Sequence, residues 1–395
     1  MNPSHRKFSA LRYALLTYIT LVTAAITLCP FDFRIPERIE IGFTGSLSDV
    51  LENIVLYIPI GFLFRVACRR SGWLPLFKAL CFGVLVSASL EACQLFLPGR
   101  NSSLIDVITN GMGVLLGAAL AAHLRGRVMK EPASFLRAFE MPLMNVLYLL
   151  IPLLWLGSFS IGGEIDRLGL VALLGVYGGS ILASVYVNQM SANQNLKGPI
   201  LTIYVLAWFV IGAMPAVIVF PLEVSAIAVG VAAAAQLSAR FWKKGEKSEH
   251  RFEVSTLKRV FPLFGAYMLL VSVWPTTLPL AHWPNGLDYK RLSELQRIVF
   301  TARFIEVIAA FTLLGYMVAG LLGRKDESGL KTAGWVFGSS VMFSIVTALL
   351  RDLLSGPLSF LLEVALLTVT ALYGALIYRL QLEAFRHMQT QEQSR

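Results

Sequence analysis

Three apolar segments decide the fold of this chain: DVLENIVLYIPIGFLFRV (49–66), LPLFKALCFGVLVSASLEACQLFL (74–97) and IDVITNGMGVLLGAALAAHL (105–124). Each is about as long as a helix that crosses a bilayer, which needs about 20 mostly apolar residues. Their acidic and amide side chains stand at the segment ends rather than in the middle. The stretch therefore predicts three consecutive membrane helices whose polar ends meet.

The composition of the whole chain agrees with a membrane protein. Of its 395 residues 56% are hydrophobic and only 15% are charged, whereas about a quarter of the residues of a soluble domain are charged. The mean hydropathy is +0.67. The net charge of +10 is spread over many loops, which favours cytoplasmic loops of a membrane protein over a nucleic-acid-binding surface. We expect no nucleic-acid partner.

The length rule predicts an all-α, polytopic protein with about twelve transmembrane helices, because lipid leaves no partner for unpaired backbone groups. The candidate spans are 10–29, 49–66, 74–97, 105–124, 141–161, 168–188, 199–219, 221–240, 257–278, 297–322, 331–350 and 358–380. Pro215 and Pro221 make the seventh and eighth spans the least regular pair. No strong internal repeat is visible in the sequence.

Most of the Lys and Arg residues fall in alternate loops if the chain begins inside the cell. This bias predicts that both termini are cytoplasmic and that the protein is a multi-pass component of the inner (plasma) membrane. We divide the chain into a four-helix module at 1–125, a basic linker at 126–140 and a bundle of about eight helices at 141–395.

In this topology the polar ends of the second, third and fourth spans all lie at the outer face. Asp49 and Asn53 are four residues apart and share one helical face, as do Asp106 and Asn110. Helix capping alone accounts for aspartates in a first turn. Glu91 is different, because it stands near a helix C-terminus in apolar surroundings and therefore needs a partner. Arg100, in the next turn, is the nearest candidate.

The polar residues and glycines of this stretch form a recognisable pattern. Its elements are Asp49-x-x-x-Asn53, Pro59-Ile-Gly61-Phe62, Ser89-x-Glu91-x-x-Gln94-x-Phe96 with Arg100, and Asp106-x-x-x-Asn110-x-x-Gly113-x-x-x-Gly117. The pattern resembles the VanZ-like family of teicoplanin-resistance-type membrane proteins, over about residues 11–125. The G-x-x-x-G element permits close helix contact, and we expect it to serve packing within the chain rather than dimerisation.

The resemblance implies a membrane protein of the bacterial envelope whose matched residues form its site. We therefore name Glu91 and Asp106 as candidate catalytic residues. The candidate substrate-binding residues are Asp49, Asn53, Gln94, Arg100 and Asn110. No zinc or metalloprotease spacing occurs, so no metal site is assigned, although Asp49, Glu91 and Asp106 offer oxygen ligands for a divalent ion. No cofactor is identified.

These residues suit a phosphate or sugar headgroup, which predicts a lipid-linked cell-wall or polysaccharide precursor, together with membrane lipids, as the partner. Three function classes stay open: an enzyme that modifies this lipid, a transporter or flippase with a path through the second half, and a non-catalytic structural module. A link to glycopeptide resistance is implied by the family alone. The sequence assigns neither an oligomeric state nor a role to residues 141–395.

Overall fold

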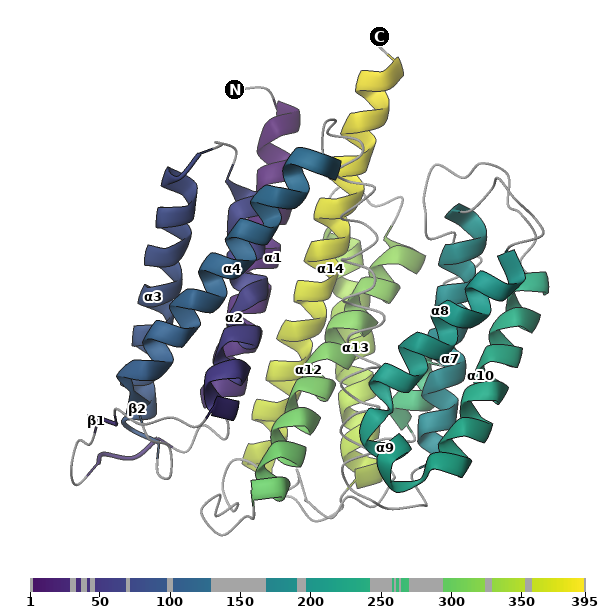
Figure 1. Ribbon diagram of the computed structural model, residues 1–395. Coiled ribbons are helices and arrows are strands. Elements are labelled where there is room, and N and C mark those ends of the chain that lie inside the picture. Colours follow the sequence, from purple (N-terminus) through teal and green to yellow (C-terminus); the bar gives the residue numbers. More distant parts are fainter. Residues whose placement is uncertain are drawn as a thin grey trace. The chain divides into compact units, whose positions relative to one another are not determined.

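The structure is a computed structural model, and it describes residues 3–28, 33–36, 41–42, 47–68, 72–97, 102–128, 168–189, 197–241, 258, 261–262, 264–269, 294–323, 329–351 and 357–393. The helices are α1 (Pro3–Leu28), α2 (Leu47–Ala67), α3 (Leu74–Gln94), α4 (Leu104–Val128), α7 (Leu168–Gln189), α8 (Lys197–Gly212), α9 (Met214–Val219), α10 (Pro221–Phe241), α12 (Glu294–Leu322), α13 (Leu330–Arg351) and α14 (Pro357–Gln393). Figure 1 shows their arrangement.

The helices confirm the predicted all-α class for nearly all of the described chain. The exception is a two-residue parallel pair, β1 (Ile41–Gly42) with β2 (Ser102–Ser103). Six described helices are long and apolar enough to cross a membrane, and four shorter apolar helices occur beside them. The count of twelve spans and the cytoplasmic termini stay predictions. The predicted span 141–161, most of the linker 126–140 and Arg100 lie outside the described residues.

The irregular pair of spans around Pro215 and Pro221 is resolved into three helices. α8 ends at Gly212, the six-residue α9 follows, and α10 begins at Pro221. A proline lacks the backbone N–H of an internal helical bond and is tolerated in a first turn. Pro215 and Pro221 both stand at such helix starts.

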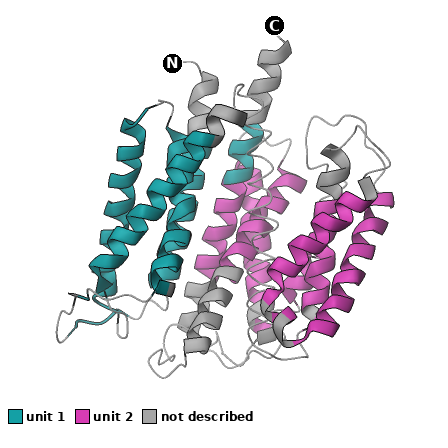
Figure 2. Ribbon diagram, in the orientation of Figure 1, with its two compact units in different colours: residues 1–141, 283–293, 377–395 teal, residues 142–282, 294–376 magenta. Residues whose placement is uncertain are grey.

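The chain divides into two compact units (Figure 2). Unit 1 comprises Met1–Met141, Trp283–Ser293 and Ile377–Arg395, and unit 2 comprises Pro142–His282 and Glu294–Leu376. The division passes through α14. The predicted module at 1–125 therefore falls wholly within unit 1.

In unit 1, α2 and α4 run parallel and share the most extensive helix contact among the described elements. Glycines make this contact possible. A Cβ atom at Gly117 would collide with the carbonyl oxygen of Ile58, and one at Gly113 with that of Ile54. Gly61 lies in the same way against the carbonyl of Val114. The prediction that G-x-x-x-G serves packing within the chain is confirmed.

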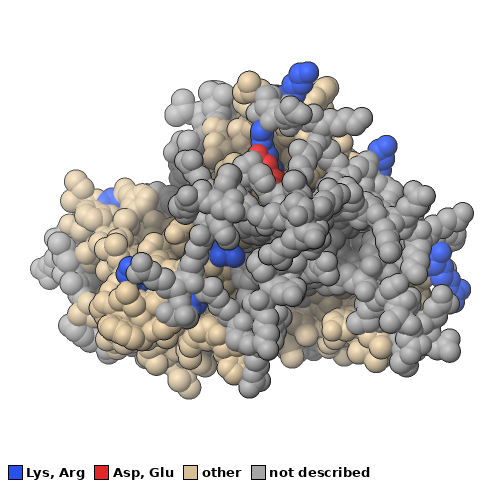
Figure 3. Space-filling view, turned by 90° about the horizontal axis from the view of Figure 1, so that it is seen from above, with Lys and Arg blue, Asp and Glu red and all other residues tan. Residues whose placement is uncertain are grey.

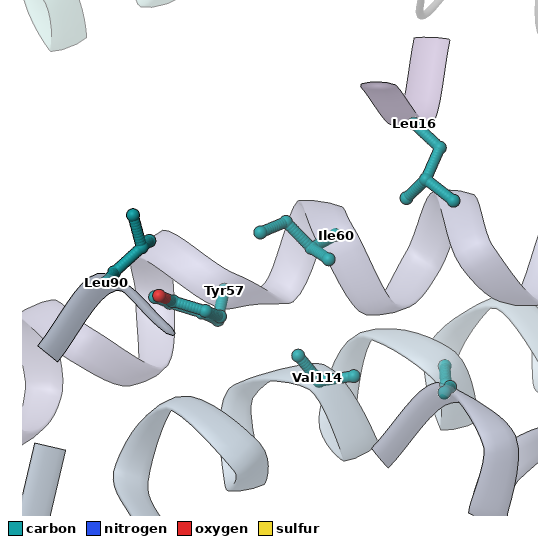
Figure 4. Packing of buried hydrophobic residues seen from close by; sticks show 7 residues of the cluster. Leu16, Tyr57, Ile60, Leu90 and Val114 are labelled. Carbon is teal, nitrogen blue, oxygen red and sulfur yellow. The ribbon is translucent and has the colours of Figure 1, made fainter. Parts of the chain in front are cut away.

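The apolar core of unit 1 draws on α1, α2, α3 and α4 (Figure 4). Its buried members are Leu16, Tyr57, Ile60, Ala79, Leu90, Val114 and Ala118. Figure 4 shows the ring of Tyr57 reaching from α2 toward Leu90 of α3.

The opposite end of unit 1 carries basic residues. Arg12 of α1 donates from Nη1 to the carbonyl oxygen of Val66 at 3.2 Å, which places a cation at the C-terminus of α2, where the helix dipole favours it. Arg65 lies in that last helical turn, and Lys78 in the first turns of α3. Figure 3, which looks onto the end where α1 begins, shows the described Lys and Arg side chains as separate patches.

In unit 2, α7, α8 and α10 pack around small residues of α7. Gly178 lies against the ring of Trp208, and Gly175 against Phe209 and Val231. Polar bridges also join these helices: the Gln236 amide donates to the Thr202 hydroxyl at 2.7 Å. Unit 2 also contains α12, α13 and the N-terminal part of α14.

Candidate functional site

Glu91 is bound to the N-terminus of the following helix. Its Oε2 accepts hydrogen bonds from the Ser102 hydroxyl at 3.0 Å and from the Ser103 backbone N–H at 2.9 Å. The Ser103 hydroxyl in turn accepts from the Ile105 N–H at 3.2 Å, as an N-cap does. Glu91 stands near the C-terminus of α3, where the dipole disfavours an anion, but the N-terminus of α4 supplies the opposite field.

This geometry explains why a carboxylate 8% exposed is tolerated at this position. Two donors converge on one oxygen, and both belong to β2, the strand that pairs with β1. Glu91 therefore fixes the turn between α3 and α4 and the loop before α2. The predicted pairing with Arg100 falls outside the described residues.

Asp106 lies close to two of the other predicted residues. A side-chain hydrogen bond joins it to Asn53, and the carboxylate of Asp49 is near enough to repel it. Both aspartates stand in the first turn of a helix, Asp49 in α2 and Asp106 in α4. Since α2 and α4 are parallel neighbours, two positive helix ends lie side by side and offset the mutual repulsion of the carboxylates.

Below these carboxylates lies a buried polar group that the sequence reading missed. Ser87 of α3 forms a side-chain hydrogen bond with Tyr57 of α2 and accepts another from the Asn110 amide at 2.9 Å. Tyr57 is 1% and Asn110 3% exposed. The Oδ1 atom of Asn110 is buried and has no hydrogen-bond partner within the described part of the chain. Such an orphaned acceptor is costly, and it marks a place where a donor fits.

Together these residues form a polar column that runs from the helix ends into unit 1. We define the polar column as Asp49, Asn53, Tyr57, Ser87, Asp106 and Asn110. Its α2 members recur every four residues, which was the available signal for Tyr57. Glu91 and Asp106 both interact electrostatically with Tyr57. Glu91, with its hydrogen bonds to β2, therefore lies next to the polar column.

Gln94 is directed elsewhere. Its amide donates to the carbonyl oxygen of Thr27 at 3.1 Å and so ties α3 to the end of α1. Among the described residues, no three His, Cys, Asp or Glu side chains come together in a way that could hold a metal ion. Asp49, Glu91 and Asp106 thus do not form the three-carboxylate group considered from the sequence.

The column is rich in hydrogen-bond acceptors. The carboxylates of Asp49 and Asp106 accept only, and the free oxygen of Asn110 is also an acceptor. These groups can bind hydroxyl or ammonium donors. They would repel a free phosphate unless a cation beside it offset their charge.

Comparison with known proteins finds similarity in the N-terminal part of the chain, which carries the polar column. Residues 6–125 match the VanZ/LLP1 family, which confirms the VanZ-like resemblance over the predicted region. Protein VanZ of Enterococcus faecium is 28% identical over 110 residues, a match that covers 28% of this chain and 60% of that protein. This chain therefore spans less than two thirds of that relative. No solved structure matches the chain. The chain carries a VanZ-like membrane segment at its N-terminus.

Proposed function

We propose that the protein recognises a lipid-linked cell-wall or polysaccharide precursor at the outer face of the inner membrane, through the polar column of its VanZ-like segment. The observation that carries the proposal is the convergence of Asp49, Asn53 and Asp106 at one end of unit 1. The basic residues of α1, α2 and α3 lie at the other end. By the positive-inside rule, the acidic end then faces outward.

The ligand-contacting carboxylates in this proposal are Asp106 and Asp49. Glu91 is a positioning residue, because its Oε2 already accepts two bonds from β2. If the protein is an enzyme, Asp106 is its acid or base, since it stands at the open end of the column beside an amide donor.

A structural module is the second candidate, and one observation favours it. Glu91 and Gln94, both taken from the sequence as site residues, form bonds that tie helices and strands together. On this view the column serves packing and binds nothing. No comparable observation in the described residues favours the transporter.

The test is resistance to teicoplanin in a susceptible bacterial host that expresses the full chain. We expect the wild-type chain to raise the inhibitory concentration at least fourfold, and Asp106→Asn to abolish the rise at unchanged protein level. Glu52→Gln is the matched control, because Glu52 lies one residue from Asn53 on α2 but is exposed. A phenotype that survives Asp106→Asn, or that is equally lost in the control, refutes the proposal. So does a wild-type chain without effect.

A further inference from the structure

The glycine contact between α2 and α4 has a specific register. Gly61 of α2 lies on the carbonyl of Val114, and Gly117 of α4 lies on the carbonyl of Ile58. On each helix, the glycine is three residues from the residue that the other glycine touches. This reciprocal pattern brings two parallel backbones into direct contact.

Unit 2 contains the same pattern. Gly315 of α12 lies on the carbonyl of Ala371, and Gly374 of α14 lies on the carbonyl of Thr312. On each of these helices, too, the glycine is three residues from the residue that the glycine of the other helix contacts. The helices α12 and α14 are parallel, like α2 and α4 (Figure 1). The two helix pairs therefore share both contacts in the same register.

The connecting helices agree as well. α3 follows Gly72 and α13 follows Gly329, and both glycines have positive φ, 111° and 76°. Buried positions then recur at the same spacings after each glycine. They are Pro75, Ala79, Gly83 and Ser87 in α3, and Thr332, Val336, Ser340 and Ser344 in α13. From Gly72 to Gly117 the chain covers the same number of residues as from Gly329 to Gly374.

The two units differ in the polar column. With the glycine contacts superposed, Phe311 takes the position of Tyr57, and Leu367 takes that of Asn110. Both replacements are buried, at 3% and 2% exposure. In the same register, Arg303 and Glu363 correspond in the sequence to Asp49 and Asp106. Among the buried members, only the serine is kept, as Ser344.

We propose that α12–α14 is a second copy of the α2–α4 unit, and that Tyr57 and Asn110, which this copy lacks, bind a hydroxyl- or amine-bearing headgroup. The second copy shows that helices of this design pack with apolar side chains at both places. The phenol and the amide of the first copy are therefore not required for the helix packing. The buried, unpartnered Oδ1 of Asn110 supplies the independent sign of a ligand.

The acceptors of the column define the ligand class. Asn110 Oδ1 and the Asp49 and Asp106 carboxylates call for donors, which sugar hydroxyls and amino groups provide. This inference rests on the proposed function and narrows it: the sugar of a lipid-linked precursor, rather than its phosphate, occupies the column.

The experiment measures binding to the purified full chain in detergent, by the shift of its unfolding midpoint with ligand concentration. The probe is a polyprenyl diphosphate that carries an N-acetylhexosamine, and the same lipid without the sugar is the reference. We expect the wild-type chain to bind the sugar-bearing lipid at least tenfold more tightly. Tyr57→Phe, which installs the residue of the second copy, should remove roughly this tenfold preference, about the effect of one hydrogen bond. The midpoint without ligand should not fall.

Paired serine variants provide the control. Ser87→Ala removes the partner of Tyr57 and Asn110, whereas Ser344→Ala changes the equivalent position of the second copy. We expect loss of the sugar preference only for Ser87→Ala. This variant should also have the lower ligand-free midpoint of the two, because the Asn110 amide and the Tyr57 hydroxyl lose their shared partner. Loss of the preference in both variants overturns the inference.

The outcomes separate this inference from the proposed function. A wild-type chain that binds neither lipid refutes both. A sugar preference that survives both Tyr57→Phe and Ser87→Ala refutes only the inference, because the headgroup then binds elsewhere. A preference lost in Tyr57→Phe together with a fall of several degrees in its ligand-free midpoint also refutes the inference, since Tyr57 would then serve packing.

Discussion

The backbone contact between Gly117 and Ile58 in unit 1 provides a quantitative prediction for Gly117→Ala. The new Cβ would lie on the Ile58 carbonyl oxygen and 2.9 Å from both the Ile58 carbonyl carbon and the Phe62 nitrogen, whereas ordinary contact begins at 3.4 Å. These atoms are backbone and cannot rotate away. The helices must therefore separate, by about 0.5 Å at the carbon and nitrogen and by more at the oxygen.

A gap of 0.5–1 Å removes about a quarter to a half of the dispersion energy of each contact. Overpacking typically costs about 1–3 kcal/mol, and we place this rigid contact at about 3 kcal/mol. Replacing glycine by alanine in a helix returns about 1 kcal/mol. The net prediction is a loss of about 2 kcal/mol in the free energy of unfolding.

Gly111→Ala in the same helix is the matched control. Its Cβ would meet only the side-chain ends of Leu80 and Val84, both at 3.3 Å, which can move by a few tenths of an ångström. The helix-propensity gain is the same, so we expect this variant to be as stable as the wild type or about 1 kcal/mol more stable. Reversible unfolding in mixed micelles measures both. Values for the two variants within 0.5 kcal/mol of each other would show that the helix contact is not close.

Three further predictions concern the anchor residues and the topology. Glu91→Ala leaves two buried donors without an acceptor and should lower the free energy of unfolding by about 2–4 kcal/mol. Glu91→Gln keeps an acceptor oxygen and should lower it by about 1 kcal/mol. Equal losses in the two variants would contradict the hydrogen bonds from β2 to Glu91. Gln94→Leu should lower the free energy of unfolding by about 1 kcal/mol, because the hydrogen bond to Thr27 is lost. Headgroup binding should stay unchanged. Weaker headgroup binding would show that Gln94 belongs to the binding site. In a chain without its native cysteines, Leu47→Cys should react with an impermeant maleimide in intact cells and His123→Cys only after lysis; the opposite result would invert the topology.

Much of the site followed from helical spacing alone. Asp49 and Asn53, like Asp106 and Asn110, were placed on shared faces because residues four apart in a helix project to one side. The structure brings Asn53 to Asp106 and Asn110 to Ser87. Tyr57 belongs to the same series on α2, but spacing alone does not single it out, because a tyrosine in an apolar run is ordinarily a core residue.

The partners of Glu91 and Gln94 could not be predicted in this way. Glu91 was expected to need a cation, but its described partners are a serine hydroxyl and a backbone N–H at the start of the next helix. Backbone donors carry no sequence signal, since every residue except proline has one. Gln94 bonds to a backbone carbonyl of α1, for the same reason invisible in the sequence.

By itself, the sequence determined that this is a helical membrane protein with a VanZ-like N-terminal segment, because apolar length and the order of polar residues are properties of the chain. Only the tertiary structure decided which polar residues meet and which hold the scaffold together. It also revealed the second copy in α12–α14. The glycine contacts keep the same register in both helix pairs, whereas most of the neighbouring side chains differ. The repeat is therefore visible in the helix packing but not in the amino-acid sequence.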